Sequence, residues 1–529
     1  MSKKQSFNPY LPSYEYVPDG EPHVFGDRVY IYGSHDRFDG ADFCLNDYVS
    51  YSADVHDLTD WRYEGVIYRG MQDPRNQNVP ANAPEAKPGF CAKADFEPKD
   101  LNAPGICPMF APDVVCGPDG RYYLYYCLDP YSETCVAVCD TPAGAYEYLG
   151  MVKYADGTIL GRREGDYTTF DPGVFVDDDG EIYLYVGNGP IRPEQEDGTK
   201  HSVVMSLEHD MLTIKGRPKK LMPSVTESGG TDYAGHEFFE ASSIRKVGGK
   251  YYFVYSSINS HELCYAVSDK PDEGYEYGGT LVDIGDVYLD GRDAKDAVNC
   301  LGNTHGGMEC IDGQWYIFYH RQSNRTNYSR QGCAEKIYFD EDGRIGQVEV
   351  TSCGMNKGAL EGKGTYPAYI CCALRAKQGT TFAHPLAMQM NFPYLTQDGG
   401  DVEPEDERAR TDSETPVQYI KNMTDGSVAG YKYFKFEDTK SITLTVRGEA
   451  KGSVEVVAVP KGITITERYA DMQGMVCGSV EIEIGGNAGA EDTGNWANVS
   501  GAVQFPAGEC ALYLRYVGEG SLDLLKFTI

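Results

Sequence analysis

Five copies of one short pattern constrain the fold of this chain more than any other feature of its sequence. Each copy joins a turn rich in glycine and aspartate to an alternating run that is heavy in aromatic side chains. The copies begin 60 to 92 residues apart and read FGDRVYIYGS, GPDGRYYLYY, DDDGEIYLYVG, VGGKYYFVYS and IDGQWYIFYH. Asp-Gly or Gly-Gly between two such runs indicates a β-hairpin. Because each interval can hold a four-stranded sheet, the repeat predicts an all-β fold with a five-bladed β-propeller. A β-sandwich with unrelated hairpins is the alternative.

The composition excludes several classes of partner. With 47 Lys and Arg against 80 Asp and Glu, the chain has a formal charge of −33, which would repel nucleic acid and anionic membranes. No apolar stretch approaches the roughly 18 residues of a membrane span, and no apolar segment follows Lys3 and Lys4 as in a secretory signal. The 16 cysteines include no C-x-x-C pair, which favours reduced thiols. We therefore expect a cytoplasmic protein.

One ionisable residue precedes the turn of each copy at a similar distance. These residues, seven to nine positions ahead of the turn glycine, are Asp19, Asp113, Asp171, Glu240 and His305. The innermost strands of a propeller line one axis, so residues at one level of these strands converge. Burying several such groups together is costly unless they are solvated or do chemical work. The pattern therefore predicts a functional site on the axis.

The residue types at this predicted site favour one kind of chemistry. Carboxylates around a pocket, with no Ser/His nucleophile pair and no phosphate loop in the sequence, are typical of glycosidic bond hydrolysis. One carboxylate must stay ionised to activate water, and another must stay protonated to donate to the leaving oxygen. A third can raise the pKa of the acid by like-charge repulsion.

Several motifs, in the correct order, resemble glycoside hydrolase family 43, whose members are five-bladed propellers and inverting glycosidases. The resemblance covers roughly residues 8 to 370 and rests on NPYLP at 8–12, FDP at 170–172 and FEASS at 239–243. It implies that Asp19 is the general base and Glu240 the general acid. It also implies that Asp171 modulates the pKa of the acid.

Further residues enter through the same resemblance. Phe110 stands where the family has the tryptophan of a WAPD motif, and it is expected to stack on the sugar. Arg321 resembles a substrate-positioning arginine. His305 matches a histidine near the axis that helps to hold a calcium or sodium ion through water. No organic cofactor is implied.

Three other carboxylates lie close to these candidates in the sequence. Glu21 follows Asp19 by two residues and is expected on the same strand face, deeper toward the channel. Glu237 precedes Glu240 by three residues. Both are weaker rivals for the roles of base and acid. Asp113 is interpreted as a hydrogen-bonded structural residue.

The chain is expected to divide into three parts. They are the propeller at 1–335, a closing segment and connector at 336–400, and a β-sandwich of jelly-roll type at 401–529. The last part resembles carbohydrate-binding module family 6, which implies sugar binding by Tyr469 and Trp496. The alternative is that both are packing residues of a buttress. Seven prolines between Met71 and Pro108 predict an irregular loop over the top face of the propeller.

The resemblance implies an inverting, exo-acting hydrolase that releases terminal α-L-arabinofuranose from oligosaccharides derived from arabinoxylan or arabinan. A β-D-xylosidase, or an enzyme with both activities, is the alternative because the two pentoses overlay closely. A carbohydrate-binding propeller without activity would be favoured if one of the three carboxylates were missing, and all three are present. Transfer to phosphate would call for a cluster of Arg or Lys beside the acids, and the sequence has none there.

Overall fold

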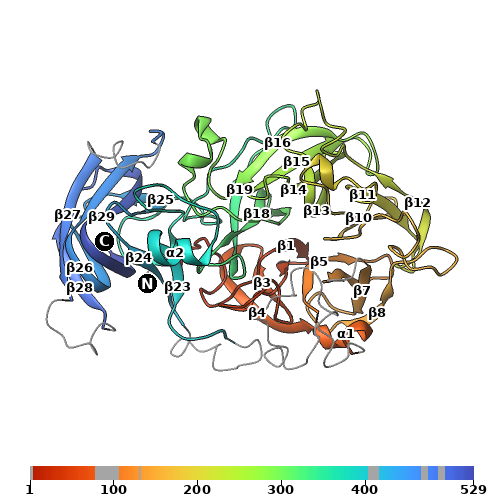
Figure 1. The fold of residues 1–529 in the computed structure, drawn as a ribbon, viewed down its shortest axis with the longest axis horizontal. Helices are drawn as coiled ribbons and strands as arrows, with labels where there is room; N and C mark the ends of the chain where they lie inside the picture. The colour runs from red at the N-terminus through yellow and green to blue at the C-terminus, as the bar shows by residue number, and fades with distance from the viewer. Residues whose placement is uncertain (1–3, 78–106, 130–132, 403–415, 466–474, 486–494) are drawn as a thin grey trace.

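The computed structural model consists almost entirely of β-strands, arranged as five sheets around an axis and a larger sheet at the C-terminal end (Figure 1). The structure describes residues 4–77, 107–129, 133–402, 416–465, 475–485 and 495–529. Most of the proline-rich segment, and with it the predicted loop over the top face, lies outside these residues. Its described beginning forms two short helical turns, η1 (Gly70–Gln72) and α1 (Pro74–Gln77). Among the described residues, no helix is long and apolar enough to cross a membrane.

The five-bladed propeller is confirmed, and each blade is an antiparallel meander. Blade 1 contains β1 (Glu21–Phe25), β2 (Arg28–Tyr32), β3 (Tyr48–Asp54) and β4 (Asp57–Tyr68). Blade 2 contains β5 (Met109–Cys116), β6 (Tyr122–Leu128), β7 (Thr134–Cys139) and β8 (Glu147–Met151). Blade 3 contains β9 (Gly173–Val176), β10 (Ile182–Val186), β11 (Val203–Leu207) and β12 (Ile214–Lys220). Blade 4 contains β13 (Phe238–Val247), β14 (Lys250–Ser257), β15 (Glu262–Ser268) and β16 (Glu276–Asp283).

Blade 5 has three strands in its described sheet, one fewer than the interval allows. They are β17 (Met308–Ile311), β18 (Gln314–Gln322) and β19 (Arg330–Ile337). The chain after β19 makes only isolated bridges, such as Phe339 with Ile345 and Val282 with Val348, before it enters the C-terminal sheet. Short 3₁₀ turns lie at η5 (Pro193–Gln195), η6 (Leu289–Gly291), η7 (Ala294–Asp296) and η8 (Ala368–Ile370).

The alternating aromatic runs of the repeat pack against both neighbouring blades. Along β2, Tyr30 and Tyr32 pack against blade 2. Val29 and Ile31 point the other way and pack against blade 5. The same division recurs along β14, whose two faces contact blades 3 and 5. Because side chains alternate across a strand, one aromatic run supplies two interblade contacts, and each blade is buried on both faces.

The turn residues of the repeat determine how the hairpins close. Gly248 and Gly249 join β13 to β14, and Asp312 and Gly313 join β17 to β18. All four have positive φ, at 58°, 85°, 49° and 80° in chain order. Positive φ at both central positions is the type I′ turn, whose twist matches that of a two-stranded ribbon. The Gly-Gly and Asp-Gly signals therefore correctly predicted these two hairpins.

The C-terminal sheet begins before the expected boundary at residue 401. Four of its strands come from the expected connector: β20 (Leu360–Glu361), β21 (Thr365–Pro367), β22 (Ala373–Arg375) and β23 (Tyr394–Gln397). The short helix α2 (Pro385–Asn391) lies between β22 and β23 in the chain. Its other strands are β24 (Gln418–Met423), β25 (Val428–Phe436), β26 (Ser441–Pro460), β27 (Val476–Ile484), β28 (Ala497–Ala502) and β29 (Gly508–Thr528). Hydrogen bonds join these described strands into one sheet around a core that includes Leu444, Val456 and Phe527. The expected connector is therefore largely part of the C-terminal sheet.

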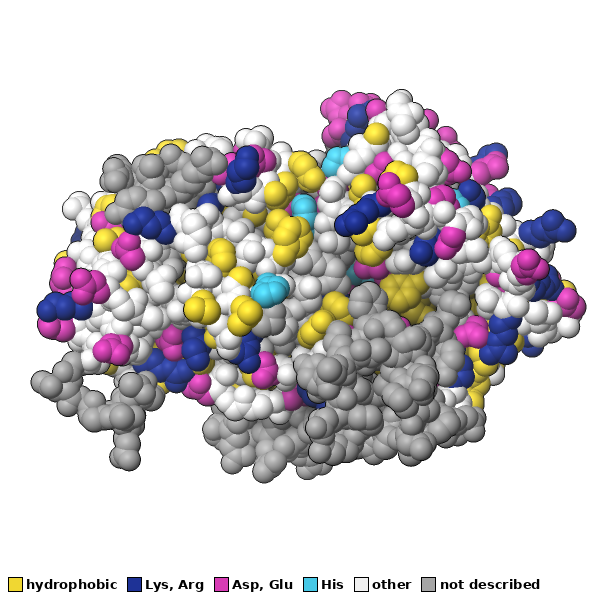
Figure 2. All heavy atoms as spheres, viewed as in Figure 1, with side chains coloured by type: hydrophobic (Ala, Val, Ile, Leu, Met, Phe, Trp, Pro, Cys, Tyr) yellow, Lys and Arg dark blue, Asp and Glu magenta, His cyan; other side chains and the backbone are white. Residues whose placement is uncertain are grey.

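The surface carries charges of both signs, and the described cysteines are unpaired. Acidic and basic side chains are interspersed on the face of the molecule drawn in Figure 2. All 15 described cysteines are free thiols. The described part of the fold is therefore held together by packing and hydrogen bonds, without disulfides.

Candidate active site

Four of the five ionisable residues of the repeat meet on the propeller axis. The first strands of the blades line this axis, because β1, β5, β9, β13 and β17 contact one another around it. Asp19, Asp171 and His305 lie two or three residues before β1, β9 and β17, and Glu240 is the third residue of β13. Electrostatic interactions link all four groups. Their equivalent positions in the blades bring residues far apart in sequence to one end of the axis.

The backbone at this cluster adopts conformations that non-glycine residues avoid. The φ angles of Asp19, Asp171 and Ala241 are 56°, 45° and 69°. Each such position costs of order 1–3 kcal/mol, roughly, and is typical of functional sites, where the surrounding fold imposes it. The turn at Ala241 is held by its backbone N–H, which donates to Asp171 Oδ2 at 3.2 Å. This hydrogen bond links the backbone of blade 4 to the side chain that precedes blade 3.

Asp19 lies in a cationic environment. Arg330 Nη1 donates to Asp19 Oδ1 at 3.0 Å, and His320 Nδ1 lies 3.1 Å from the same oxygen. Burial alone would raise the pKa of Asp19, but the charge of Arg330 and the hydrogen bond with His320 lower it below its usual range. Asp19 is therefore ionised at neutral pH, as a group that takes a proton from water must be.

Glu240 has the opposite environment. It is half-buried, and Asn188 Nδ2 donates to Glu240 Oε2 at 3.3 Å. Burial and the nearby carboxylate of Asp171 raise the pKa of Glu240 well above its usual range. Glu240 therefore keeps its proton where Asp19 has lost one. Two carboxyl groups of one cluster thus have pKa values shifted in opposite directions.

Asp171 and His305 interact electrostatically with both Asp19 and Glu240. Asp171 Oδ2 lies 3.4 Å from His305 Nδ1, and both side chains are buried. Burial raises the pKa of Asp171, while the His305 ring opposes this shift. The pKa of His305 rises to about 9, because its interactions with Asp171 outweigh the effect of burial. The cluster can therefore hold one carboxyl group ionised and another protonated.

The chain matches known proteins over its full length. Residues 91–345 match the model of glycosyl hydrolases family 43. A xylosidase/arabinosidase from Thermoclostridium stercorarium is 45% identical over 532 residues, which cover 100% of this chain and 99% of that protein. The chain belongs to glycosyl hydrolase family 43. A beta-xylosidase from Xylanibacter ruminicola is 29% identical over 359 residues, which cover 63% of this chain and 97% of that protein.

A solved structure of a family 43 arabinoxylan arabinofuranohydrolase from Bacillus subtilis, in complex with cellotetraose, resembles the chain with a TM-score of 0.48 and 19% identity. The match covers 98% of this chain and 96% of that one. Membership of family 43 and the full-length relative make this chain a glycosidase.

The two predicted substrate-binding residues of this family 43 enzyme have different positions. Phe110 is near the cluster, with its ring 5.6 Å from that of Phe170, which precedes Asp171. Arg321 is not near it. Its guanidinium donates to the backbone carbonyls of Tyr369 and Cys371, where the propeller meets the C-terminal sheet. The structure therefore does not bring Arg321 to the cluster, because its neighbour His320, and not Arg321, faces the axis.

The arginine that contacts the cluster is Arg330, which the sequence analysis missed. His320 and Arg321 are neighbours on β18 and point to opposite faces. Because His320 pairs with Gly332 of β19, Arg330 lies on the same face as His320. Its Nε and Nη2 also lie 2.9 Å from the two carboxylate oxygens of Asp36. The strand register of blade 5, once known, would have identified it.

Replacing Arg330 by Met should move the acid limb of the kcat/KM–pH profile to higher pH. Without the guanidinium, the pKa of Asp19 rises, so the base becomes protonated at a higher pH than in the parent enzyme. Arg330→Lys, which keeps the charge, should move the limb less. Arg344→Met, at an exposed position, is the control, and a lower rate with an unmoved acid limb would contradict the assignment.

The rival carboxylates have other partners. Glu21 Oε1 accepts a hydrogen bond from Ser243 Oγ at 2.5 Å and pairs with Arg245 at 3.1 Å, inside the channel. Glu237 accepts from Ser228 Oγ at 2.5 Å in the loop before β13. Neither rival shares the environment of Asp19 or Glu240.

Asp113 lies at a junction of three blades. Its Oδ1 is 2.6 Å from His23 Nε2 of blade 1, and its Oδ2 accepts from the backbone N–H of Val174 in blade 3 at 2.7 Å. Asp113 is buried, and both of its oxygens are used. It links adjacent blades, which is the structural role expected for it.

The donors around His305 do not fit a cation held directly by this residue. In the described part of the chain, two groups of three side chains bring potential ligand atoms within 4.8 Å of one another. They are Glu21, His23 and Asp113, and His236, Glu262 and Cys264; neither includes His305. A cation held near His305 through water stays a prediction.

Trp496 of the C-terminal sheet is half-buried in a cluster of aromatic and charged side chains. The guanidinium of Arg447 lies 4.4 Å from the ring centroids of both Trp496 and Tyr419. Arg447 also pairs with Asp398 at 2.7 Å. These contacts support the packing alternative for Trp496, and sugar binding by this sheet stays a prediction. Tyr469 lies outside the described residues.

Proposed function

We propose that this family 43 enzyme is an inverting, exo-acting glycosidase that releases terminal pentose, with α-L-arabinofuranose as the first candidate. The observation that supports the mechanism is the opposed shift of two pKa values in one cluster: that of Asp19 is lowered and that of Glu240 is raised. Two such groups supply the base and the acid of a single displacement.

In this mechanism a water molecule attacks the anomeric carbon while Asp19 takes one of its protons. Glu240 donates its proton to the glycosidic oxygen, and the bond from that oxygen to the anomeric carbon breaks. The products are the free sugar with inverted configuration and the shortened oligosaccharide. Asp171 orients Glu240 and disfavours its ionised form, since its carboxylate raises the pKa of Glu240. Proton exchange with solvent restores both carboxyl groups.

The pentose class is supported by the names of the relatives. The protein that is 45% identical is named a xylosidase/arabinosidase, and another is named a beta-xylosidase. These names favour β-D-xylosidase activity, alone or beside arabinofuranosidase activity, as the second candidate. Both candidates take oligosaccharides derived from arabinoxylan or xylan.

One pair of assays tests the substrate class and the stereochemistry. The purified chain should release nitrophenol from the α-L-arabinofuranoside, the β-D-xyloside or both, and the ratio of their kcat/KM values decides between the candidates. Proton NMR in the first minutes should detect β-L-arabinose or α-D-xylose, the inverted anomers, before mutarotation. Turnover of neither glycoside would contradict the substrate class, and the retained anomer would contradict the single displacement.

A further inference from the structure

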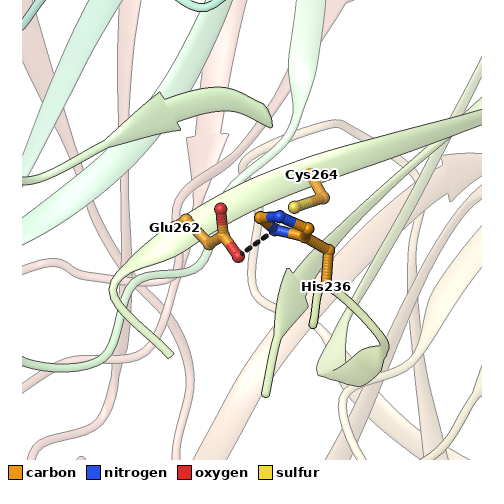
Figure 3. A group of neighbouring side chains, drawn as sticks. All are labelled: His236, Glu262 and Cys264. Carbon is orange, nitrogen blue, oxygen red and sulfur yellow. Dashed lines mark hydrogen bonds and ion pairs between the residues drawn. The ribbon is translucent and has the colours of Figure 1, made fainter. Parts of the chain in front are cut away.

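A histidine, a glutamate and a cysteine come together in blade 4, outside the cluster on the axis. Figure 3 shows the ring of His236 beside the side chains of Glu262 and Cys264. We propose that these three residues bind a divalent metal ion of the Zn²⁺ class. The site is separate from the proposed glycosidase chemistry, which uses none of them.

The fold determines the positions of all three side chains. Glu262 and Cys264 are two residues apart on β15, so their side chains leave the same face of the strand. His236 comes from the loop before β13, and its backbone carbonyl accepts from Tyr255 Oη at 2.8 Å. Its ring stacks on Tyr277 at a centroid distance of 5.4 Å. Strand alternation and this packing therefore position the ligand atoms.

The distances between the potential ligand atoms are close to, but not yet, those of a metal-bound site. His236 Nδ1 lies 2.8 Å from Glu262 Oε1, and one potential ligand atom from each residue lies within 4.8 Å of the others. Tetrahedral zinc bonds of about 2.0–2.3 Å require ligand atoms closer together than this upper limit. Glu262 and Cys264 are fully buried, whereas the side chain of His236 is 25% exposed. The partly exposed His236 therefore leaves the site open to solvent on one side.

The donor set favours a zinc-like ion. Imidazole nitrogen, carboxylate oxygen and thiolate sulfur are the three donor types of protein zinc sites, and sulfur disfavours calcium and magnesium.

The second group of possible ligands lacks these advantages. Glu21, His23 and Asp113 offer no sulfur, and Arg245 lies 3.1 Å from Glu21 Oε1, where its charge would repel a cation. Among the described residues, Glu262 forms an ion pair with His236 and with no Lys or Arg. The group in blade 4 is therefore the one that a divalent ion could enter.

A metal ion at this site would connect the loop that precedes β13 to β15. Glu240 is four residues after His236, so the ion would stabilise the start of the strand that carries the candidate acid. Since the ion would bind the folded chain and not the unfolded one, it should raise the melting temperature.

Cobalt spectroscopy tests the proposal directly. Chelator-treated full-length chain titrated with Co²⁺ should develop tetrahedral visible bands and a thiolate-to-cobalt charge-transfer band, and Zn²⁺ should remove both. Cys264→Ser should lose the charge-transfer band, whereas the matched control Cys310→Ser should keep it. Absence of these bands in the parent chain, or their persistence in Cys264→Ser, would overturn the proposal.

A thermal measurement gives a second, independent readout. Zn²⁺ added to the chelator-treated chain should raise Tm by a few degrees, and this shift should be lost in His236→Gln. The Tm of each variant without metal shows whether it folds. An equal Zn²⁺-induced shift in the parent chain and in a folded His236→Gln variant would also overturn the proposal.

Discussion

Asp19→Asn is expected to lower kcat by about 10²–10⁴-fold, the usual contribution of a general base. The amide cannot take a proton from water, although its oxygen can still accept a hydrogen bond from Arg330. The backbone N–H of residue 19 still donates to His320 Nδ1. Because the base acts on water and not on the leaving group, the loss should be similar for an oligosaccharide and for an activated aryl glycoside. Steady-state kinetics on both substrates measure this effect.

Glu21→Gln is the matched comparison for this loss. Glu21 lies two residues after Asp19, at the start of β1, and is held by Ser243 and Arg245. Its replacement should retain far more activity than Asp19→Asn, with the stability of each variant measured by thermal unfolding. If Glu21→Gln abolished turnover while Asp19→Asn retained it, the base would be Glu21.

Glu240→Ala is expected to lower kcat on oligosaccharides by about 10²–10⁴-fold, because the leaving oxygen no longer receives a proton. An aryl glycoside with a dinitrophenolate leaving group needs little protonation, so its loss should be much smaller. The alkaline limb of the pH profile should also disappear. In the parent enzyme that limb reports ionisation of Glu240, whose pKa is raised well above the usual range.

Glu237→Gln is the control for the acid. Glu237 is three residues away and accepts hydrogen bonds from Ser228 and from the backbone of Gly235, so its loss removes loop contacts rather than a proton donor. It should reduce the rates on both substrates by the same small factor. Equal large losses on both substrates in Glu240→Ala would count against its role as the acid.

The repeated pattern was sufficient to predict most of the propeller. Alternating aromatic residues and Gly/Asp turns are local properties, and they specify hairpins whose two faces must both be buried. The positions of Asp19, Asp171 and Glu240 ahead of the hairpins followed from the same repeat, because equivalent places in successive blades converge on one axis. Those three predictions needed no knowledge of the register between strands.

Arg330 could not be found in this way. It lies 311 residues from Asp19 and is the first residue of β19, a strand outside the repeated pattern. Only the pairing of β18 with β19 shows that Arg330 shares a face with His320. Arg321 was the nearer choice in sequence, but the alternation of side chains directs it away from the axis. The early start of the C-terminal sheet likewise depends on long-range pairing, as between β21 and β29.

The sequence by itself determined the β-hairpins, the five blades and the three carboxyl groups on the axis. Only the tertiary structure decided which carboxyl group lies beside a buried cation and which lies beside another carboxylate. The opposed pKa values of Asp19 and Glu240 come from those neighbours. A pKa shift depends on burial and on charges a few ångströms away, and strands distant in sequence supply both.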